Sequence, residues 1–213
     1  MIRNQYRDIS HAEQGCHNGT VKLADGLVTL LFTDIEGGVQ LWEADRDAMA
    51  AASARHDRMV REQIEASGGH VFKTVGEAHR AVFADPVAAL SSAVAIQRAA
   101  GAEPWASSLP IGVCMALHSG ACAERGGDYV GPVANRTARL LDIGHGGQVL
   151  VTAATYALLA DRLPGGIGLR DLGEQRLKDL GRAERVFQVT GSEERRVGKE
   201  CVRLCRSRWS PYH

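Results

Sequence analysis

Residues 28–38 read VTLLFTDIEGG, an apolar run that ends in a carboxylate and a pair of glycines. The mostly apolar, β-favouring residues before Asp34 predict a buried strand over about 27–33. A carboxylate at the end of such a strand can bind a hard cation such as Mg²⁺. The flexible backbone of Gly37 and Gly38 can turn its N–H groups toward a phosphate. A plain strand followed by a polar turn fits the same pattern, because Asp and Gly are common turn residues.

The composition predicts one domain of ordinary size. The chain has 213 residues, with 25 basic and 25 acidic side chains, which is ample for a single hydrophobic core. Its longest apolar windows are too short to span a membrane, and the N-terminus has no apolar signal region. We therefore expect a cytoplasmic protein that does not contact a membrane.

The two ends of the chain differ from its middle. Residues 1–26 are polar and aperiodic, which predicts a loose N-terminal extension. Ser192–His213 holds six basic and three acidic residues, without apolar periodicity. It resembles the translation of a sequencing adapter, so 191–213 is expected to be an artefactual, non-native tail, and Cys201 and Cys205 are not expected to bind metal. The rest has a net charge near −3, which gives no electrostatic basis for direct nucleic-acid contact.

Apolar spacing and turn residues predict a series of strands and helices after the first strand. Helices are expected over 38–67, 85–100, a stretch containing 135–141, and 153–160. Strands are expected over 70–75, 78–83, 109–119, 128–130 and 148–152. Two more strands are expected between 169 and 189. The core order is β-α-β-β-α-β. It predicts an α+β fold, a ferredoxin-like sandwich with helices on one face of an antiparallel sheet.

This topology brings the end of the first strand close to the turn of the hairpin at 70–83. Asp34 and Glu77 should then lie side by side. Two carboxylates this close repel each other unless a cation lies between them, so the sequence suggests a divalent metal site. An ordinary solvated turn residue is the alternative for Glu77.

Four ordered segments resemble one known family. They are LLFTDIEGG at 30–38, HVFKTVGEAHRAVF at 70–83, GGDYVGPVANRTARLLDIGHGGQVLV at 126–151 and LRDLGEQRLKDLGRAERVFQV at 169–189. Together they resemble the catalytic domain of the class III adenylate/guanylate cyclases, in a bacterial form, over about 27–190. The resemblance implies the class III nucleotide cyclase fold.

The resemblance also implies an activity and its metal ions. It implies an adenylate cyclase, a phosphorus–oxygen lyase that converts ATP to 3′,5′-cyclic AMP and pyrophosphate with two Mg²⁺ or Mn²⁺ ions. Asp34 matches the first metal carboxylate and the Ile35 backbone carbonyl a further metal contact. Glu77 stands at the second carboxylate position, where the family usually has Asp, and this departure is expected to weaken turnover.

Further site residues follow from the same resemblance. Asn135 and Arg139, one helical turn apart, match the residues that orient the ribose and stabilise the α-phosphate. Lys73 and Asp128 match the pair that selects adenine, and Lys178 matches a triphosphate-binding lysine. Taken singly, these polar residues fit a solvated surface equally well.

The family assembles each active site from two subunits, so a homodimer with shared sites is expected. Gly37 and Gly38 are expected to bind phosphate through their backbone. A different class of function remains open: a degenerate cyclase-like module that binds nucleotide and dimerises with little or no turnover. Guanylate formation is disfavoured by Lys73 and Asp128, because guanylate-forming relatives carry Glu and Cys there. His79 and Arg80 also depart from the family pattern, and one of the two must face inward.

Overall fold

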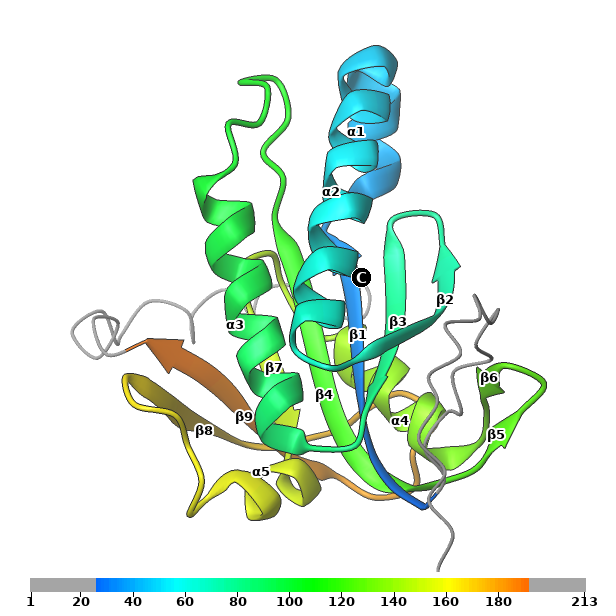
Figure 1. Ribbon diagram of the computed structural model, residues 1–213, viewed down its shortest axis with the longest axis vertical. Coiled ribbons are helices and arrows are strands. Elements are labelled where there is room, and N and C mark those ends of the chain that lie inside the picture. The colour runs from blue at the N-terminus through cyan, green and yellow to red at the C-terminus, as the bar shows by residue number, and fades with distance from the viewer. Residues whose placement is uncertain (1–25, 192–213) are drawn as a thin grey trace, which may run out of the picture.

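The computed structural model describes residues 26–191 (Figure 1). The expected extension before residue 26 and the expected tail after residue 191 lie outside the described residues. Within 26–191, no helix combines the length and the apolar character that a membrane crossing requires.

Five helices and nine strands make up the described part. The helices are α1 (Gly38–Ala44), α2 (Arg46–Ala66), α3 (Pro86–Ala102), α4 (Pro132–Leu141) and α5 (Ala153–Leu159). The strands are β1 (Gly26–Ile35), β2 (His70–Val75), β3 (Ala78–Phe83), β4 (Val113–Cys122), β5 (Glu124–Arg125), β6 (Asp128–Tyr129), β7 (Val149–Thr152), β8 (Ile167–Gln175) and β9 (Glu184–Gly191).

Seven strands form one sheet in the order β2-β3-β1-β4-β7-β9-β8, and β5 and β6 form a separate ribbon. All pairs in the large sheet are antiparallel except β4 with β7. The first four strands and the helices between them have the ferredoxin-like connection. The α+β prediction is confirmed, and β7, β8 and β9 extend this core on the side of β4 (Figure 1).

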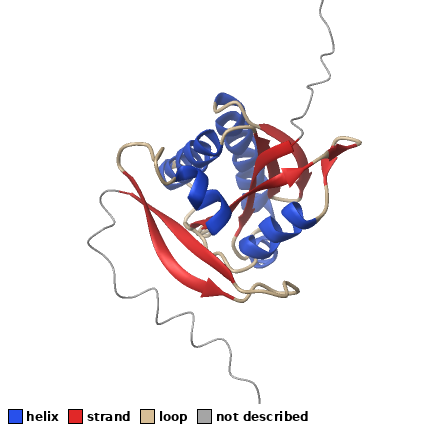
Figure 2. Ribbon diagram, turned by 90° about the horizontal axis from the view of Figure 1, so that it is seen from below, coloured by secondary structure: helices blue, strands red, loops and turns tan. Residues whose placement is uncertain are grey.

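Both faces of the sheet are covered by helices (Figure 2). Leu31 of β1 packs in a cluster with α2, α3 and α5 residues, whereas Leu30 and Phe32 pack with Val133 and Ala134 of α4. The core helices α2 and α3 lie on one face as expected, and α4 covers the other face, which was not expected. The uninterrupted apolar run in β1 explains the difference, because a strand that is buried on both faces lacks alternation.

Two predicted elements depart most from the structure. The helix expected over 38–67 is broken at Asp45, whose carboxylate accepts a hydrogen bond from the Ala48 N–H at 3.0 Å and caps α2. This is the usual role of Asp at a helix N-terminus. The strand expected over 109–119 begins only at Val113, because Leu109 instead packs in a small apolar cluster with Met49 of α2.

His56 of α2 is fully buried, and neither of its ring nitrogens has a hydrogen-bond partner in the described part of the chain. Burial, with a smaller effect from His79, lowers the pKa of His56 from 6.5 to about 4. His56 therefore stays neutral in the folded state at pH values where the unfolded chain takes up a proton.

Replacing His56 with Leu should reduce the acid sensitivity of the fold. Between about pH 6.5 and 4 the unfolded chain binds a proton at His56 that the folded chain does not, so stability falls as pH falls. The free energy of unfolding then falls by up to about 1.4 kcal/mol for each pH unit. We expect chemical denaturation across pH 4–7 to give a shallower slope for His56→Leu than for the wild type. An unchanged slope, matching that of the exposed-site control His145→Leu, would contradict this account.

Candidate active site

The two predicted metal carboxylates lie at the same end of the sheet. Asp34 is near the end of β1, and Glu77 occupies the turn between β2 and β3. The register of β1 with β3 pairs Thr33 with His79, so the turn comes alongside the last residues of β1. The negative charge of Glu77 contributes to the raised pKa of Asp34, as expected for two carboxylates at one end of the sheet.

Asp34 is half-buried, and its pKa is raised above the usual 3.8. Burial is the largest cause, and the negative charges of Glu77 and Asp142 add to it. The Ile35 N–H, which donates to Oδ1 at 2.9 Å, acts in the opposite direction. The ionised carboxylate is therefore costly in the protein alone, as expected where a cation would balance it.

The donor set at this end of the sheet fits a hard divalent cation. Asp34 and Glu77 offer carboxylate oxygens and Ile35 a carbonyl oxygen, which are the ligands that Mg²⁺ prefers. Within residues 26–191 no group of three or more His, Cys, Asp or Glu side chains could hold a metal ion. An ion here would therefore need the Ile35 carbonyl and oxygens of the nucleotide to complete its coordination.

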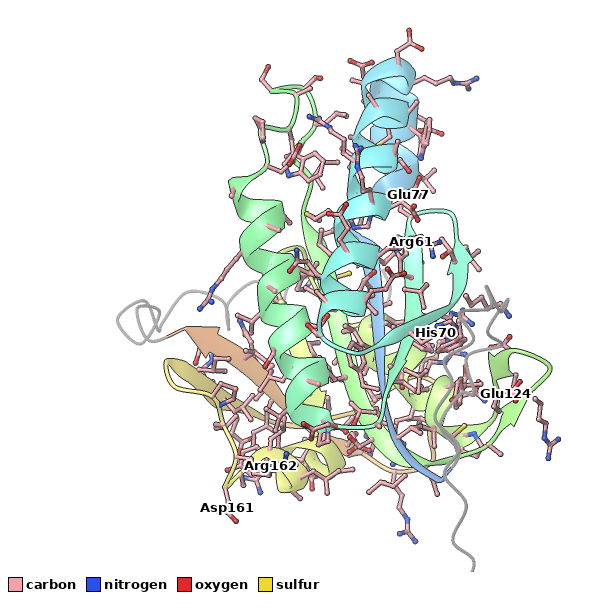
Figure 3. The ribbon with its side chains drawn as sticks, viewed as in Figure 1. Arg61, His70, Glu77, Glu124, Asp161 and Arg162 are labelled. Carbon is pink, nitrogen blue, oxygen red and sulfur yellow. The ribbon has the colours of Figure 1, made fainter. Side chains whose placement is uncertain are left out.

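Glu77 makes contacts that sequence reasoning missed. Its Oε1 accepts a hydrogen bond from Trp42 Nε1 at 2.7 Å and a longer one from Ser53 Oγ at 3.3 Å. Trp42 lies in α1 and Ser53 in α2, so the carboxylate reaches from the hairpin turn to both helices; Figure 3 shows Glu77 beside α2. The extra methylene of Glu was the available signal, because it lengthens the reach of this side chain.

The backbone of the hairpin is also tied to α2. His79 Nδ1 lies 3.1 Å from the Glu77 carbonyl oxygen and Nε2 lies 2.8 Å from Asp57 Oδ1. Both partners are acceptors, so both contacts are hydrogen bonds only when the ring carries two N–H groups. Arg61 adds a second link, since it donates to Asp57 at 2.9 Å and to Thr74 of β2 at 2.8 Å.

The inward-facing residue of the unusual pair in β3 is His79, which is 1% exposed. Arg80 points to the other face, where its guanidinium lies 5.1 Å from the centre of the Phe32 ring. Both departures from the family pattern are therefore accommodated by specific partners.

Lys73 and Asp128, 55 residues apart in sequence, form an ion pair of 2.5 Å between Nζ and Oδ2. This hydrogen bond from Lys73 holds the pKa of Asp128 below its usual range. Their neighbours in sequence, Phe72 and Tyr129, are also in contact, edge to face with ring centres 5.0 Å apart. The structure thus places a cationic donor and a carboxylate acceptor beside each other, as a pair that could read the edge of a base.

Asn135 and Arg139 lie on α4, with Asn135 exposed and Arg139 half-buried. Arg139 forms ion pairs of 3.1 Å with Asp142 and 2.7 Å with Asp179. Asp179 follows Lys178 directly, so the loop between β8 and β9 reaches α4 and carries the exposed Lys178 to this region. The partners Asp142 and Asp179 were not anticipated, because their contacts depend on how this loop folds.

By the elements that carry them, the predicted residues divide into two groups. Asp34, Ile35 and Glu77 make a carboxylate group at the end of β1, with Gly37 and Gly38 directly after it. Lys73, Asp128, Asn135, Arg139 and Lys178 come from β2, β6, α4 and the β8–β9 loop. Within the described residues, no hydrogen bond or ion pair joins Asp34 or Glu77 to Lys73, Asn135 or Arg139.

Comparison with known proteins shows what the chain is similar to. It is 40% identical over 191 residues to an uncharacterized protein of Mycobacterium tuberculosis, covering 89% of this chain and 61% of that protein. It is 27% identical over 204 residues to a receptor-type adenylate cyclase of Trypanosoma equiperdum, covering 76% of this chain and 44% of that protein. The chain thus spans less than two thirds of the length of these relatives. No protein-family model matches it.

Solved structures support the same class. An adenylate cyclase from Trypanosoma brucei in its monomeric state has a TM-score of 0.68 at 28% identity, covering 81% of this chain and 93% of that one. An adenylate/guanylate cyclase/hydrolase from Silicibacter pomeroyi has a TM-score of 0.67 at 28% identity, covering 77% and 96%. The fold is therefore that of adenylate/guanylate cyclase domains. Its structural neighbours and curated homologues are class III adenylate/guanylate cyclase catalytic domains.

Proposed function

We propose that this chain is an adenylate cyclase that converts ATP to 3′,5′-cyclic AMP and pyrophosphate as a homodimer with shared active sites. The observation that carries the proposal is the close pairing of Lys73 with Asp128. The lysine would donate to N1 of adenine and the carboxylate would accept from its exocyclic amine. Guanine presents the opposite pattern of donors and acceptors at these positions, so the pair favours ATP.

The reaction forms one bond and breaks another at the α-phosphorus. The ribose 3′-oxygen bonds to the α-phosphorus, the bond from that phosphorus to the bridging oxygen breaks, and pyrophosphate leaves while the hydroxyl proton passes to solvent. Asn135 would hold the ribose, and the planar, multi-donor guanidinium of Arg139 would stabilise charge on the α-phosphate. To stabilise this charge, Arg139 must break its ion pair with Asp179 and bind the phosphate instead.

The triphosphate would lie on the Gly37–Gly38 turn and Lys178. Gly37 has a φ of 68°, a conformation that glycine adopts without strain and that turns backbone N–H groups outward. Mg²⁺ or Mn²⁺, held by Asp34, the Ile35 carbonyl and Glu77, would favour ionisation of the attacking hydroxyl and neutralise phosphate charge.

Two copies are part of the proposal because, within the described residues, no hydrogen bond or ion pair joins the carboxylate group to Arg139. A twofold dimer places one surface of each copy against the other copy, so the carboxylate group of one chain would face Arg139 of its partner. Each dimer would then contain two sites of mixed origin.

The test is direct assay of product. The full chain is incubated with ATP and Mn²⁺ or Mg²⁺, and cyclic AMP is quantified by chromatography with and without a chelator. We expect product that depends on the divalent ion and rises with the fraction of dimer. Nucleotide binding without product, at concentrations where the dimer is populated, would overturn the proposal.

A second candidate, a nucleotide-binding dimerisation module, is favoured by one observation. Trp42 and Ser53 already engage one oxygen of Glu77, which leaves fewer lone pairs for a metal ion. This candidate predicts binding without turnover in the wild type and the appearance of cyclic AMP in the Glu77→Asp variant.

Replacing Lys73 with Glu should erode the preference for ATP over GTP. The change puts two carboxylates side by side and removes the donor to adenine, so we expect the ATP/GTP ratio of kcat/KM to fall by about tenfold or more, since losing one charged hydrogen bond costs about 1.5–3 kcal/mol. The matched control is a variant that reverses the charge of Arg125, which pairs with Asp128 in the β5–β6 ribbon. A ratio unchanged by Lys73→Glu would remove the base-selection argument.

A further inference from the structure

The two carboxylate oxygens of Glu77 lie in different surroundings. Oε1 accepts hydrogen bonds from Trp42 at 2.7 Å and from Ser53 at 3.3 Å. Oε2 lies toward Gly38, 3.8 Å from the position that a Cβ on this glycine would occupy. One oxygen is therefore anchored to α1 and α2, and the other faces the glycine turn that follows Asp34 and Ile35.

We propose that Trp42 and Ser53 are positioning residues that hold Oε1 of Glu77 and thereby present Oε2 to a divalent cation as a single-oxygen ligand. This inference rests on the proposed function, because it assumes that the cation binds between Glu77 and Asp34. It assigns a role to the unusual Glu: its length lets two helices fix a carboxylate that stands on a hairpin turn.

Side-chain length is the physical basis of the proposal. An Asp at position 77 would be shorter by one C–C bond, about 1.5 Å, and could not keep the 2.7 Å contact with Trp42. A free Glu loses more rotamer freedom than Asp when it binds an ion. The two donors restrict these rotamers in advance, and the contact of His79 with the Glu77 carbonyl oxygen restrains the backbone as well.

The hydrogen bond itself can be observed without any turnover. In the full chain labelled with ¹⁵N-tryptophan, the indole N–H signal of Trp42 is identified by its loss in Trp42→Phe. We expect this signal to move upfield in Glu77→Asp, because the carboxylate acceptor is withdrawn. The signal of Trp105, whose indole donates to the Ala100 carbonyl at 2.8 Å, should not move. A Trp42 signal that is the same in both backgrounds would overturn the inference.

Cation binding tests the positioning role. Mn²⁺ affinity is measured by electron paramagnetic resonance of the free ion in the presence of 3′-deoxy-ATP, which lacks the attacking hydroxyl. We expect Trp42→Phe to weaken Mn²⁺ binding by about tenfold, the value of one charged hydrogen bond, and Ser53→Ala to weaken it less. In the Glu77→Asp background, Trp42→Phe should change the affinity by less than about twofold.

The control is Trp105→Phe, which removes a comparable half-buried indole bond from the same apolar cluster and should leave Mn²⁺ affinity unchanged. An equal loss from Trp42→Phe in both backgrounds would show a merely structural role and would overturn the proposal. Tighter binding in Trp42→Phe would also overturn it, because the indole would then compete with the cation.

The outcomes separate this inference from the proposed function. Cyclic AMP production by the wild type, together with no coupling between Trp42 and Glu77, would leave the cyclase proposal standing and remove the positioning role. Coupling between Trp42 and Glu77 in the Mn²⁺ measurement, without cyclic AMP production, would leave the positioning role standing and remove the cyclase proposal.

Discussion

Asp34→Asn is expected to reduce cyclic AMP formation by about a thousandfold and to raise the thermal stability of the metal-free protein. The loss of activity follows because the amide is a far weaker ligand for a hard cation, and metal ions supply several kcal/mol of charge stabilisation in such reactions. The gain in stability follows because Asn removes a charge that burial disfavours, while its carbonyl oxygen can still accept from the Ile35 N–H.

The stability gain of Asp34→Asn depends on pH. The pKa of Asp34 is raised in the folded protein, so the folded state loses stability relative to the unfolded state as pH rises through this raised value. The advantage of Asp34→Asn should therefore grow with pH, as a larger gain in thermal midpoint at neutral pH than at pH 4. Calorimetry at pH 4 to 8 without divalent ions measures this difference in thermal midpoint.

Asp171→Asn is the matched control for this stability effect. The Asp171 carboxylate forms an ion pair with Arg185, and the hydrogen bond from Arg185 lowers the pKa of Asp171. Removal of the Asp171 charge should therefore not stabilise the fold. Mn²⁺ should raise the midpoint of the wild type and of Asp171→Asn but not that of Asp34→Asn. An Asp34→Asn protein that is no more stable than the wild type, or that keeps its activity, would contradict the account of this site.

Arg139→Ala is expected to lower kcat by about a hundredfold to a thousandfold, the usual effect of losing one donor to developing charge. Its KM for ATP should change less, because this donor acts mainly in the transition state. The fold should be little affected, since exposed ion pairs contribute little to stability. Steady-state kinetics with Mn²⁺ and ATP provide both parameters.

Arg136 offers a control on the same helix. It forms an ion pair of 3.1 Å with Glu184 of β9 and belongs to neither predicted group. Arg136→Ala should keep near wild-type kcat. Equal losses from the two substitutions would show that α4 needs its charges for structure and would leave Arg139 without a specific role.

The core of the fold could be predicted because its elements are local and strongly patterned. The apolar run of β1, the Gly76 turn of the hairpin, and Asp85 with Pro86 at the start of α3 each mark an element by short-range chemistry. The break at Asp45 could also have been found, since Asp caps α2 in the usual manner. The apolar run of β1 indicates that both faces are buried, but it could not identify the helix that covers the second face, because this depends on which side of the sheet the chain crosses after β6.

For the candidate site, the sequence suggested residues by type but not the contacts that they make. The sequence brought Lys73 and Asp128 together only through resemblance, and their ion pair spans 55 positions. The hydrogen bonds of Trp42 to Glu77 and of Arg139 to Asp179 depend on the packing of α1 and on a loop conformation. Such contacts have no local signal, since each joins elements that meet only in the folded chain.

Mixing two inactive variants tests the central claim most directly. Asp34→Asn and Arg139→Ala are each assayed alone and after co-refolding in equal amounts. A statistical mixture contains half heterodimers, each with one undamaged site, so about a quarter of wild-type cyclic AMP formation should return if each site takes its carboxylates from one copy and its arginine from the other. A mixture as inactive as its two components, with heterodimers shown to be present, would contradict the shared site.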